Sequence, residues 1–342
     1  MDLPTISIVI PTLNSSRTLG DCLDSIKSQD YPQDRIEVVI ADGGSVDGTL
    51  ALVKSKLSSI TYRILPNPLK TGEAGKAVGV KQARNEIIAL VDSDNILSQP
   101  DWLQRMVEPF RDPEIAASEP IYYTYRRTDP YITRYCALLG MNDPICLFLG
   151  NYDRYCLLTG LWTEVPHNEE DKGGYLKIEF PDPNRIPTIG ANGFLIRREI
   201  IEQYSIGDYF FDIDIIYDLV QRGSAKIAKV KVGIIHLYCD SMSQFIRKQR
   251  RRVKDYIYYK NIGLRKYPWD KTKKLRLFKF SLYTLLVIPL LIQVVMGMSR
   301  KRDISWFFHP IACWLTLLVY GYNELRDKVL TVSAESRKGW GR

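Results

Sequence analysis

One apolar run that ends in four polar residues most strongly constrains how this chain folds. Residues 87–91 read Ile-Ile-Ala-Leu-Val, and Asp92-Ser93-Asp94-Asn95 follow directly. An apolar run of this length, bounded by polar residues, is typical of a buried central strand in a mostly parallel sheet. Open sheets of this kind bind ligands at the carboxyl ends of their strands. The run therefore presents two carboxylates where a ligand is expected.

The spacing of Asp92 and Asp94 allows two interpretations. Residues i and i+2 of a strand point to the same side, so the two carboxylates can face one cation, or one can face a ribose and the other a cation. Hard oxygen ligands favour Mg²⁺ or Mn²⁺, held together with substrate phosphates. The structural alternative is an Asx-rich turn that closes the strand, because Asp, Ser and Asn are ordinary turn residues.

Strand and helix patterns alternate over the first hundred residues. Earlier strands are predicted at residues 6–11, 36–41 and 62–65, with helical periodicity between them. The alternation predicts an α/β fold with a mostly parallel, doubly wound sheet.

Two polar segments of this region are placed to meet a ligand. Asp42 lies at the tip of the second strand, in a Gly-rich segment whose backbone can approach a ligand closely. Residues 70–76 form a Gly and Lys segment that ends in Lys76 and precedes a predicted helix over 77–84. Such a segment before a helix is suited to bind phosphate.

Three segments together resemble the nucleotide-sugar motifs of family 2 glycosyltransferases, which have the GT-A fold. They are residues 7–14 (SIVIPTLN), 41–49 (ADGGSVDGT) and 92–94 (DSD), and their order and spacing match as well as their letters. The resemblance covers roughly residues 6–253. It implies an inverting transferase that uses a nucleotide-diphospho-sugar donor and Mg²⁺ or Mn²⁺.

The resemblance also implies roles for single residues on the donor side. Asp42 would contact the base, Asp92 the ribose or the metal, and Asp94 the metal on the diphosphate. Pro11 would shape the first loop, and Asn14 stands where many relatives place an acidic residue or Asn.

The acceptor side is expected after residue 100. Residues 128–187 form a long insertion, and such a length between core strands is usually a functional lid or an acceptor loop. In the resembled family a small-residue loop before a strand forms the acceptor side, which implies acceptor contacts for Asn192 and Gly193. The alternative is a Gly-rich turn before an ordinary strand.

The resemblance implies a general base near residue 212. Relatives carry Glu-Asp here, followed two residues later by another acid, and the first Asp is the base. Aligning on the helix that ends at Gly223 places Asp212 on that base, whereas Phe211 replaces the Glu. Losing the acidic neighbour should reduce like-charge repulsion at Asp212. The structural alternative is an N-cap for the following helix.

His236 lies at the tip of a strand predicted over residues 230–235. Neutral imidazole can complete a Mn²⁺ shell, and some GT-A enzymes use a late histidine in this way. A purely structural histidine is the alternative.

The basic segment 249–252 resembles the Q-x-x-R-W motif of processive relatives, with Val253 in place of Trp. It implies that Gln249, Arg250 and Arg252 bind the donor diphosphate, for which guanidinium groups are suited. The same basic helix could instead lie against anionic lipid, and both can hold for different faces. The missing Trp argues against a processive polymerase.

Two apolar segments, 280–298 and 304–323, are each about as long as a membrane span. Residues 254–279 are expected to be a basic juxtamembrane linker, and residues 324–342 a tail. A spanning hairpin would place the basic residues between the segments outside, against the positive-inside tendency. The alternative is a pair of helices in the membrane plane. Membrane lipid is a predicted partner in either case.

Composition narrows the partner classes. The chain has 342 residues, a net charge of +8 and a pI near 9.0, which favour an anionic partner. Nucleic acid would explain the charge but neither the apolar segments nor the carboxylates, so it is not expected. The six cysteines are scattered without C-x-x-C pairing, which indicates reduced cytosolic thiols.

These observations predict a GT-A domain over residues 1–253, with a nucleotide-sugar half (1–100) and an acceptor half (101–253). The expected function is transfer of a sugar to a hydroxyl of a lipid-linked or cell-surface glycan, at a membrane and facing the cytoplasm. A polyprenyl-phosphate acceptor is the enzymatic alternative. A membrane-bound scaffold or binding protein is the alternative without catalysis.

Overall fold

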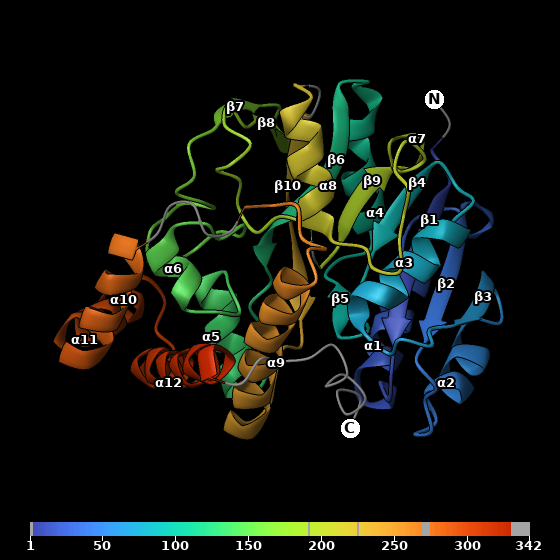
Figure 1. Cartoon of the computed structure of the whole chain (residues 1–342). Helices are drawn as coiled ribbons and strands as arrows, with labels where there is room; N and C mark the ends of the chain where they lie inside the picture. Colours follow the sequence, from blue (N-terminus) through green and yellow to red (C-terminus); the bar gives the residue numbers. More distant parts are fainter. Residues whose placement is uncertain (1–2, 191, 224–225, 269–273, 330–342) are drawn as a thin grey trace.

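A ten-stranded mixed sheet forms the centre of the molecule (Figure 1). The computed structural model describes residues 3–190, 192–223, 226–268 and 274–329. The strand order is β3-β2-β1-β4-β9-β6-β10-β8-β7, and β5 pairs with β10 outside this path.

The first half of the sheet is parallel, as predicted. Its strands are β1 (Ile6–Thr12), β2 (Ile36–Asp42), β3 (Thr61–Pro66) and β4 (Ile87–Leu90). The helices between them are α1 (Ser16–Lys27), α2 (Thr49–Lys56) and α3 (Gly72–Gln82). The register pairs Thr12 with Asp42, so the first two motif loops leave the sheet at the same edge.

The second half of the sheet is mixed, which the predicted parallel order did not include. Strand β9 (Phe194–Arg197) lies antiparallel between β4 and β6 (Ile115–Tyr123). Strand β10 (Lys226–His236) pairs with β6 in parallel and with β5 (Asn95–Leu97) and β8 (Tyr175–Glu179) in antiparallel orientation. Parallel neighbours need a long crossover connection, usually a helix, whereas an antiparallel strand such as β9 can be inserted between β4 and β6 without one.

The predicted insertion 128–187 is more ordered than a free lid. It contains the helices α5 (Tyr131–Leu139) and α6 (Ile145–Leu149) and the hairpin strands β7 (Asn168–Asp171) and β8. Since β8 pairs with β10, part of this segment extends the central sheet.

Helix α3 begins five residues earlier than predicted, at Gly72, so the Gly and Lys segment is its first turn and not a loop before it. The Thr71 hydroxyl caps the helix by accepting a hydrogen bond from the Ala74 backbone nitrogen at 3.2 Å. A Cβ at Gly79 would lie 2.2 Å from Val9 Cγ1. The glycine therefore lets the backbone of α3 lie directly on β1.

Two apolar clusters cover the two faces of the sheet. Ile8 and Val9 belong to different clusters because neighbouring residues of a strand point to opposite faces. The remaining helices of the catalytic region are α4 (Trp102–Val107), α7 (Arg198–Ile201), α8 (Asp212–Gln221) and α9 (Met242–Asn261), with the 3-10 turns η1 (Gln33–Arg35) and η2 (Glu108–Arg111).

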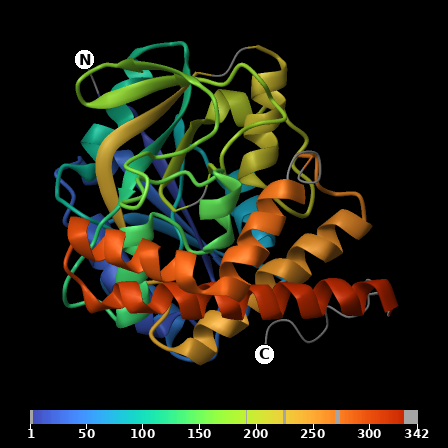
Figure 2. The ribbon, with the colours of Figure 1, turned by 90° about the vertical axis from the view of Figure 1, so that its left-hand side faces the viewer.

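The C-terminal segment forms a layer on one side of the sheet. It contains α10 (Lys274–Leu286), α11 (Ile288–Arg300), the 3-10 turn η3 (Ile304–Phe307) and α12 (Phe308–Val329). In Figure 2 the orange-red and red helices of this layer run across the face turned to the viewer. The stretch 254–279, expected to be a linker, contains the end of α9 and the start of α10. The predicted tail begins within α12, and its residues 330–342 lie outside the described part of the chain.

One helical stretch of the described residues, Ile304–Arg326, is long and apolar enough to cross a membrane. Helices α10 and α11 reach that length only as a pair, and they are bent by 89° at Val287. Length and composition therefore allow a span without establishing one.

Candidate active site

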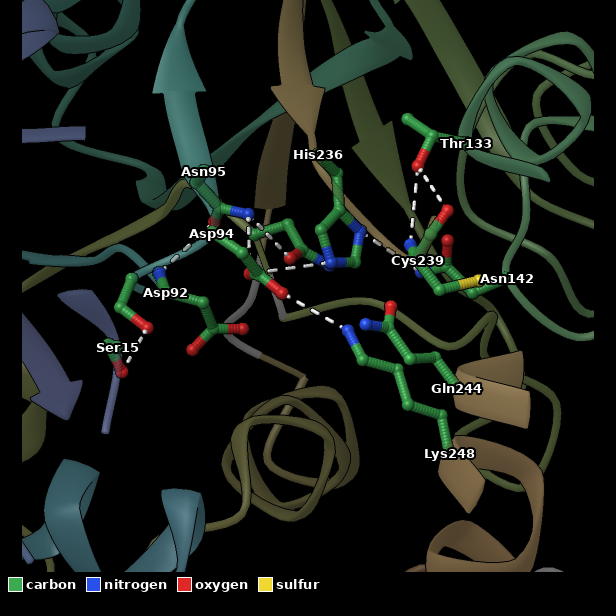
Figure 3. A network of polar contacts seen from close by, with 12 residues as sticks. Ser15, Asp92, Asp94, Asn95, Thr133, Asn142, His236, Cys239, Gln244 and Lys248 are labelled. Carbon is green, nitrogen blue, oxygen red and sulfur yellow. Dashed lines mark hydrogen bonds and ion pairs between the residues drawn. The ribbon is translucent and has the colours of Figure 1, made fainter. Parts of the chain in front are cut away.

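The turn after β4 brings Asp92 and Asp94 to the edge of the sheet (Figure 3). The strand ends at Leu90, so a turn, and not strand geometry, sets the directions of the two carboxylates. Asn95 closes the turn because its Oδ1 accepts a hydrogen bond from the Asp92 backbone nitrogen at 3.0 Å. The structural alternative, an Asx-type turn, is confirmed, and the same turn carries both carboxylates, whose role toward a ribose or a cation stays a prediction.

Asp94 meets two basic side chains. Its Oδ1 lies 3.5 Å from His236 Nε2, and its Oδ2 lies 3.2 Å from Lys248 Nζ (Figure 3). Burial would raise the pKa of Asp94, but His236 and Lys248 outweigh burial and hold that pKa below its usual range. Asp94 is therefore ionised at neutral pH, as a metal ligand must be.

The other ring nitrogen of His236 contacts Asn142, at 3.2 Å between Nδ1 and the amide nitrogen. If Nε2 is to bind a metal, the ring proton must sit on Nδ1 and needs an acceptor. Asn142 Oδ1 is buried and has no hydrogen-bond partner among the described residues. A turn of the Asn142 amide would bring this oxygen to Nδ1, so the surroundings of His236 suit a metal ligand.

A divalent cation fits this donor set only together with the donor substrate. Among the described residues, no group of three or more His, Cys, Asp or Glu side chains is close enough to hold a metal. Asp94 and His236 supply one carboxylate and one imidazole, and Asp92 lies in the same turn. Mg²⁺ and Mn²⁺ are commonly bound by one or two carboxylates plus substrate phosphates.

Asp212 is the first residue of α8 and pairs with Lys76 of α3, at 2.7 Å between Oδ2 and Nζ. Both side chains are nearly buried, with 12% and 11% exposed. The second carboxylate oxygen, Oδ1, is buried and has no hydrogen-bond partner in the described structure. One oxygen is therefore held in place by Lys76, while the other is enclosed and keeps its capacity to accept a hydrogen bond.

The electrostatics of this pair suit a base. Burial raises the pKa of Asp212 to about 6, although Lys76 opposes the increase. Burial disfavours the charge of Lys76, but Asp212 and then Asp92 outweigh it and hold the pKa of Lys76 above its ordinary value. Lys76 thus stays protonated between two carboxylates, and Asp212 titrates close to neutral pH.

Gly190 provides the space for Asp212. A Cβ on Gly190 would lie 2.2 Å from Asp212 Cβ, and the glycine has a φ of +116°. Its backbone nitrogen donates to Glu119 Oε1 at 2.9 Å. Glu119 is fully buried and pairs with Arg154 at 2.9 Å and Lys229 at 2.6 Å. The buried ionic network of Glu119 thus holds Gly190, against which Asp212 packs.

Asp42 organises its own loop. Its carboxylate accepts hydrogen bonds from Thr12 Oγ1, Ser45 Oγ and the backbone nitrogens of Gly44 and Ser45, at 2.6–2.9 Å. Burial would raise its pKa, but these bonds, led by those from Ser45, lower it. A carboxylate accepts about four bonds, so a contact with a donor base would have to replace one of them.

Asn14 and Pro11 join the loops of the donor side. Asn14 Oδ1 accepts from the Val46 backbone nitrogen at 3.0 Å, and Ser45 Oγ accepts from the Asn14 backbone nitrogen at 2.8 Å. Pro11 packs against α3, where a Cβ at Gly75 would lie 2.8 Å from Pro11 Cβ. Pro11 therefore shapes the first loop and Asn14 joins it to the next one, while their contact with a donor stays a prediction.

Asn192 and Gly193, which were predicted to contact the acceptor, are buried beneath the Asp92 turn. The Asn192 side chain accepts from Asn95 Nδ2 and donates to the Tyr123 hydroxyl, both at 3.0 Å, and it is 6% exposed. A Cβ on Gly193 would approach Trp102. Their burial favours a supporting role beneath the Asp92 turn over direct contact with an acceptor.

The basic segment of α9 is arranged differently from its predicted diphosphate contacts. Gln249 is fully buried, and its Oε1 accepts from Arg252 at 2.9 Å. Arg252 also pairs with Asp143 at 3.3 Å, and Arg250 is exposed. The residue of this helix that reaches the site is Lys248, which the motif comparison missed because it lies one position before the motif.

Comparisons with known proteins agree with this geometry. The family model described as glycosyl transferase family 2 matches residues 7–205. Poly(ribitol-phosphate) beta-N-acetylglucosaminyltransferase TarS of Staphylococcus aureus is 33% identical over 95 residues, which are 27% of this chain and 17% of that protein. Glycosyltransferase AglE of Haloferax volcanii is 33% identical over 107 residues, which are 31% of this chain and 35% of that protein.

These curated relatives are matched over about a third of their length or less. Among solved structures, the mannosyltransferase PcManGT from Pyrobaculum calidifontis, in complex with GDP-Man and Mn²⁺, has a TM-score of 0.55 at 15% identity. That comparison covers 96% of this chain and 89% of that chain, and it confirms the predicted GT-A fold. Since the family model covers more than half of its residues, this chain belongs to glycosyl transferase family 2.

Proposed function

We propose that this protein is an inverting glycosyltransferase that moves a sugar from a nucleotide-diphospho-sugar to a hydroxyl of a lipid-linked or cell-surface glycan. The observation that carries this proposal is the buried oxygen of Asp212 that has no hydrogen-bond partner among the described residues. A buried carboxylate with one oxygen held by Lys76 and the other without a partner is arranged to accept a proton. Its pKa of about 6 lets it do so near neutral pH.

The proposed reaction is a single displacement. The acceptor oxygen attacks the anomeric carbon and forms the new C–O bond, while the bond from that carbon to the donor phosphate breaks. The hydroxyl proton passes to Asp212 Oδ1, and the nucleoside diphosphate leaves with the bonding electrons. Attack from the face opposite the leaving group inverts the anomeric carbon.

A bound Mg²⁺ or Mn²⁺ would neutralise charge that develops on the leaving diphosphate. Asp94 and His236 would hold it, with Asp92 directed to the ribose or the same ion. The ion pair of Lys248 with Asp94 supports a role for this lysine beside the diphosphate. We assign Lys248 to the diphosphate, whereas Lys76, which the sequence suggested for phosphate, pairs with Asp212.

The proposed donor and acceptor classes draw on the relatives as well as the site. Both relatives are named as glycosyltransferases, and the name of TarS specifies poly(ribitol-phosphate). PcManGT was solved with a nucleotide-diphospho-sugar and Mn²⁺. The exposed apolar helices at the C-terminus favour a membrane location, with the catalytic domain on the cytoplasmic side, where nucleotide-sugars are available.

A donor screen tests this function. Purified full-length protein in detergent is offered a panel of nucleotide-diphospho-sugars with membrane lipid extract as acceptor, and released nucleotide is measured. We expect one donor to be consumed with acceptor, EDTA to stop the reaction reversibly, and Asp94→Asn to abolish it because an amide cannot replace the charge that anchors the cation.

Asp21→Asn, at an exposed position of α1, is the matched control and should retain activity. Turnover that survives both EDTA and Asp94→Asn would contradict the metal assignment. The absence of any donor consumption in the presence of a working acceptor extract would contradict the enzymatic proposal.

A further inference from the structure

Exposed apolar side chains gather on the C-terminal layer. The structure describes 24 large apolar side chains as exposed, and 17 of them lie between Leu275 and Leu325. The most exposed include Leu275 at 80%, Ile288 and Val295 at 68%, and Leu325 at 67%. Soluble monomers rarely expose so many neighbouring apolar residues, so this surface needs an apolar partner. We call these 17 side chains the α10–α12 face.

The opposite side of the same helices is packed into the protein. Trp306 and Phe308 of the layer are buried in one cluster with Tyr135, Phe148 and Phe245 of the catalytic region. The ring centroids of Phe245 and Phe308 are 5.2 Å apart. The layer therefore has two apolar sides. The inner side packs on the rest of the protein, and the outer side is exposed.

Polar contacts also tie the layer to the catalytic region. Asp303 accepts a hydrogen bond from the Tyr125 hydroxyl and pairs with Arg134 at 3.1 Å. Further along α12, the Tyr320 hydroxyl donates to Asp143. Moving this helix across a bilayer would break these contacts and leave their polar groups in hydrocarbon, at high cost.

The shape of the layer also opposes a span. The 89° bend between α10 and α11 lies at Val287, which has a φ of +62° and precedes Pro289 by two residues. Neither half alone, at 13 residues, reaches across a hydrocarbon core. Figure 2 shows the helices of the layer running across one face instead of projecting from it.

The charges of the layer suit an anionic surface. Between residues 274 and 323 the basic side chains are Lys274, Arg276, Lys279, Arg300, Lys301 and Arg302. Asp303 is the single acidic residue in this range, and it is 9% exposed. Basic residues beside an exposed apolar face are typical of helices that lie at the level of lipid headgroups.

We infer that the α10–α12 face docks in the plane of an anionic lipid bilayer without crossing it. The exposed apolar side chains enter the acyl boundary, and the basic side chains contact the headgroups. The inner side of the layer stays packed on the catalytic domain. This inference does not depend on the proposed reaction, because it rests on the exposed face and its contacts alone.

Vesicle flotation tests the lipid surface. Full-length protein is exchanged from detergent onto preformed phosphatidylcholine vesicles with or without phosphatidylglycerol. We expect flotation with both, and stronger binding with phosphatidylglycerol at low salt. The double variant Leu285→Asp and Val295→Asp should lower the partition coefficient by at least about tenfold, because both exposed side chains would lose their apolar contact.

Val46→Asp is the control, since Val46 is 89% exposed and lies beside α2, on the side of the molecule away from α10 and α11 in Figure 1. It should float like the parent protein. A parent protein that forms a dimer without lipid and fails to float would assign the face to a second copy of the chain and overturn the inference.

Cysteine labelling distinguishes in-plane docking from a spanning hairpin of α10–α11 with α12. Single variants Lys301→Cys and Ser58→Cys, both at exposed positions, are produced in bacterial membranes and treated with an impermeant maleimide in inverted and right-side-out vesicles. In-plane docking places residues 301 and 58 on the same side of the membrane. The parent chain, with its native cysteines, gives the labelling background. Labelling of Lys301→Cys from the side opposite to Ser58→Cys would show a spanning hairpin and contradict the inference.

Discussion

The two sides of the site are built from interactions of different range. On the donor side, Asp42 is satisfied by Ser45, three residues away, and by Thr12 on the adjacent strand. On the acceptor side, Asp212 pairs with Lys76 over 136 residues. Glu119 pairs with Lys229 over 110 residues. The donor loops are thus held by contacts within one loop or between two neighbouring loops, whereas the proposed base depends on the assembly of the whole sheet.

This difference implies different consequences of substitution. A change in a donor loop should mainly weaken donor binding, since the bonds of these loops are made within one loop or to the neighbouring loop. A change in the acceptor-side network should affect folding and catalysis together, because the groups that hold the base are also buried charges. The following substitutions test that contrast, from the largest expected effect to the smallest.

Glu119→Gln should cause the largest loss of stability. It removes the negative charge between Arg154 and Lys229, both fully buried; Arg154 keeps its ion pair with Asp153, whereas Lys229 loses the carboxylate with which it pairs. Breaking a buried ion pair costs about 3–5 kcal/mol, and we expect a loss of this size in the free energy of unfolding by urea. Glu114→Gln, at a largely exposed carboxylate that pairs with Lys177 and Lys226, should cost much less, because exposed ion pairs contribute little to stability. An equal loss in the free energy of unfolding for Glu119→Gln and Glu114→Gln would contradict the special importance of the buried network.

Gly190→Ala should reduce turnover more than it reduces donor binding. The new Cβ would need the space of Asp212 Cβ, 2.2 Å away, and would displace the base. A misplacement of about 1 Å can cost about 10²-fold, which we expect in kcat while the donor KM changes little.

The control is Gly207→Ala, because no atom lies within 4 Å of a Cβ at that position. It should retain the parent kcat. A Gly190→Ala enzyme with parent kcat would show that the close approach of this glycine does not position Asp212.

Lys76→Met should have a smaller effect, on the pH dependence. Lys76 opposes the increase in the pKa of Asp212 that burial causes, so its removal should raise that pKa above about 6. The acidic limb of the activity profile should then move to higher pH by about one unit or more. Lys81→Met, at an exposed position of the same helix, should leave the profile unchanged. An acidic limb at the same pH in Lys76→Met as in the parent enzyme would show that Lys76 does not control the pKa of Asp212.

Much of the donor side was predictable from the sequence. The strand boundaries at residues 6–11 and 36–41 agree with β1 and β2 to within one residue, because alternating apolar patterns and Gly-rich loops are local signals. The turn at Asp92 also follows from a short segment. The N-cap suggested for Asp212 was wrong, because Phe211 is the N-cap and Asp212 is the first residue of α8.

The partners of those side chains were less predictable. Lys248 lies on a helix with several other Lys and Arg residues, and the sequence does not indicate which of them contacts Asp94. The way α9 packs on the sheet decides that it is Lys248. Glu119 and Lys229 are single charges in apolar strands, with no local signal of their pairing. The position of β9 between β4 and β6 depends on long-range strand pairing, which periodicity does not specify.

The pH dependence of kcat/KM in the parent enzyme and in Asp212→Asn tests most directly whether Asp212 is the base. With a hydroxyl acceptor, we expect the parent enzyme to lose activity as pH falls through about 6, because Asp212 must be unprotonated to accept the proton. Asp212→Asn should lose about 10² to 10⁴ in turnover, with donor binding nearly unchanged, and should lack this limb. Turnover of Asp212→Asn within a few-fold of the parent enzyme, with the limb retained, would contradict the assignment and favour an acceptor that needs no base, such as a polyprenyl phosphate.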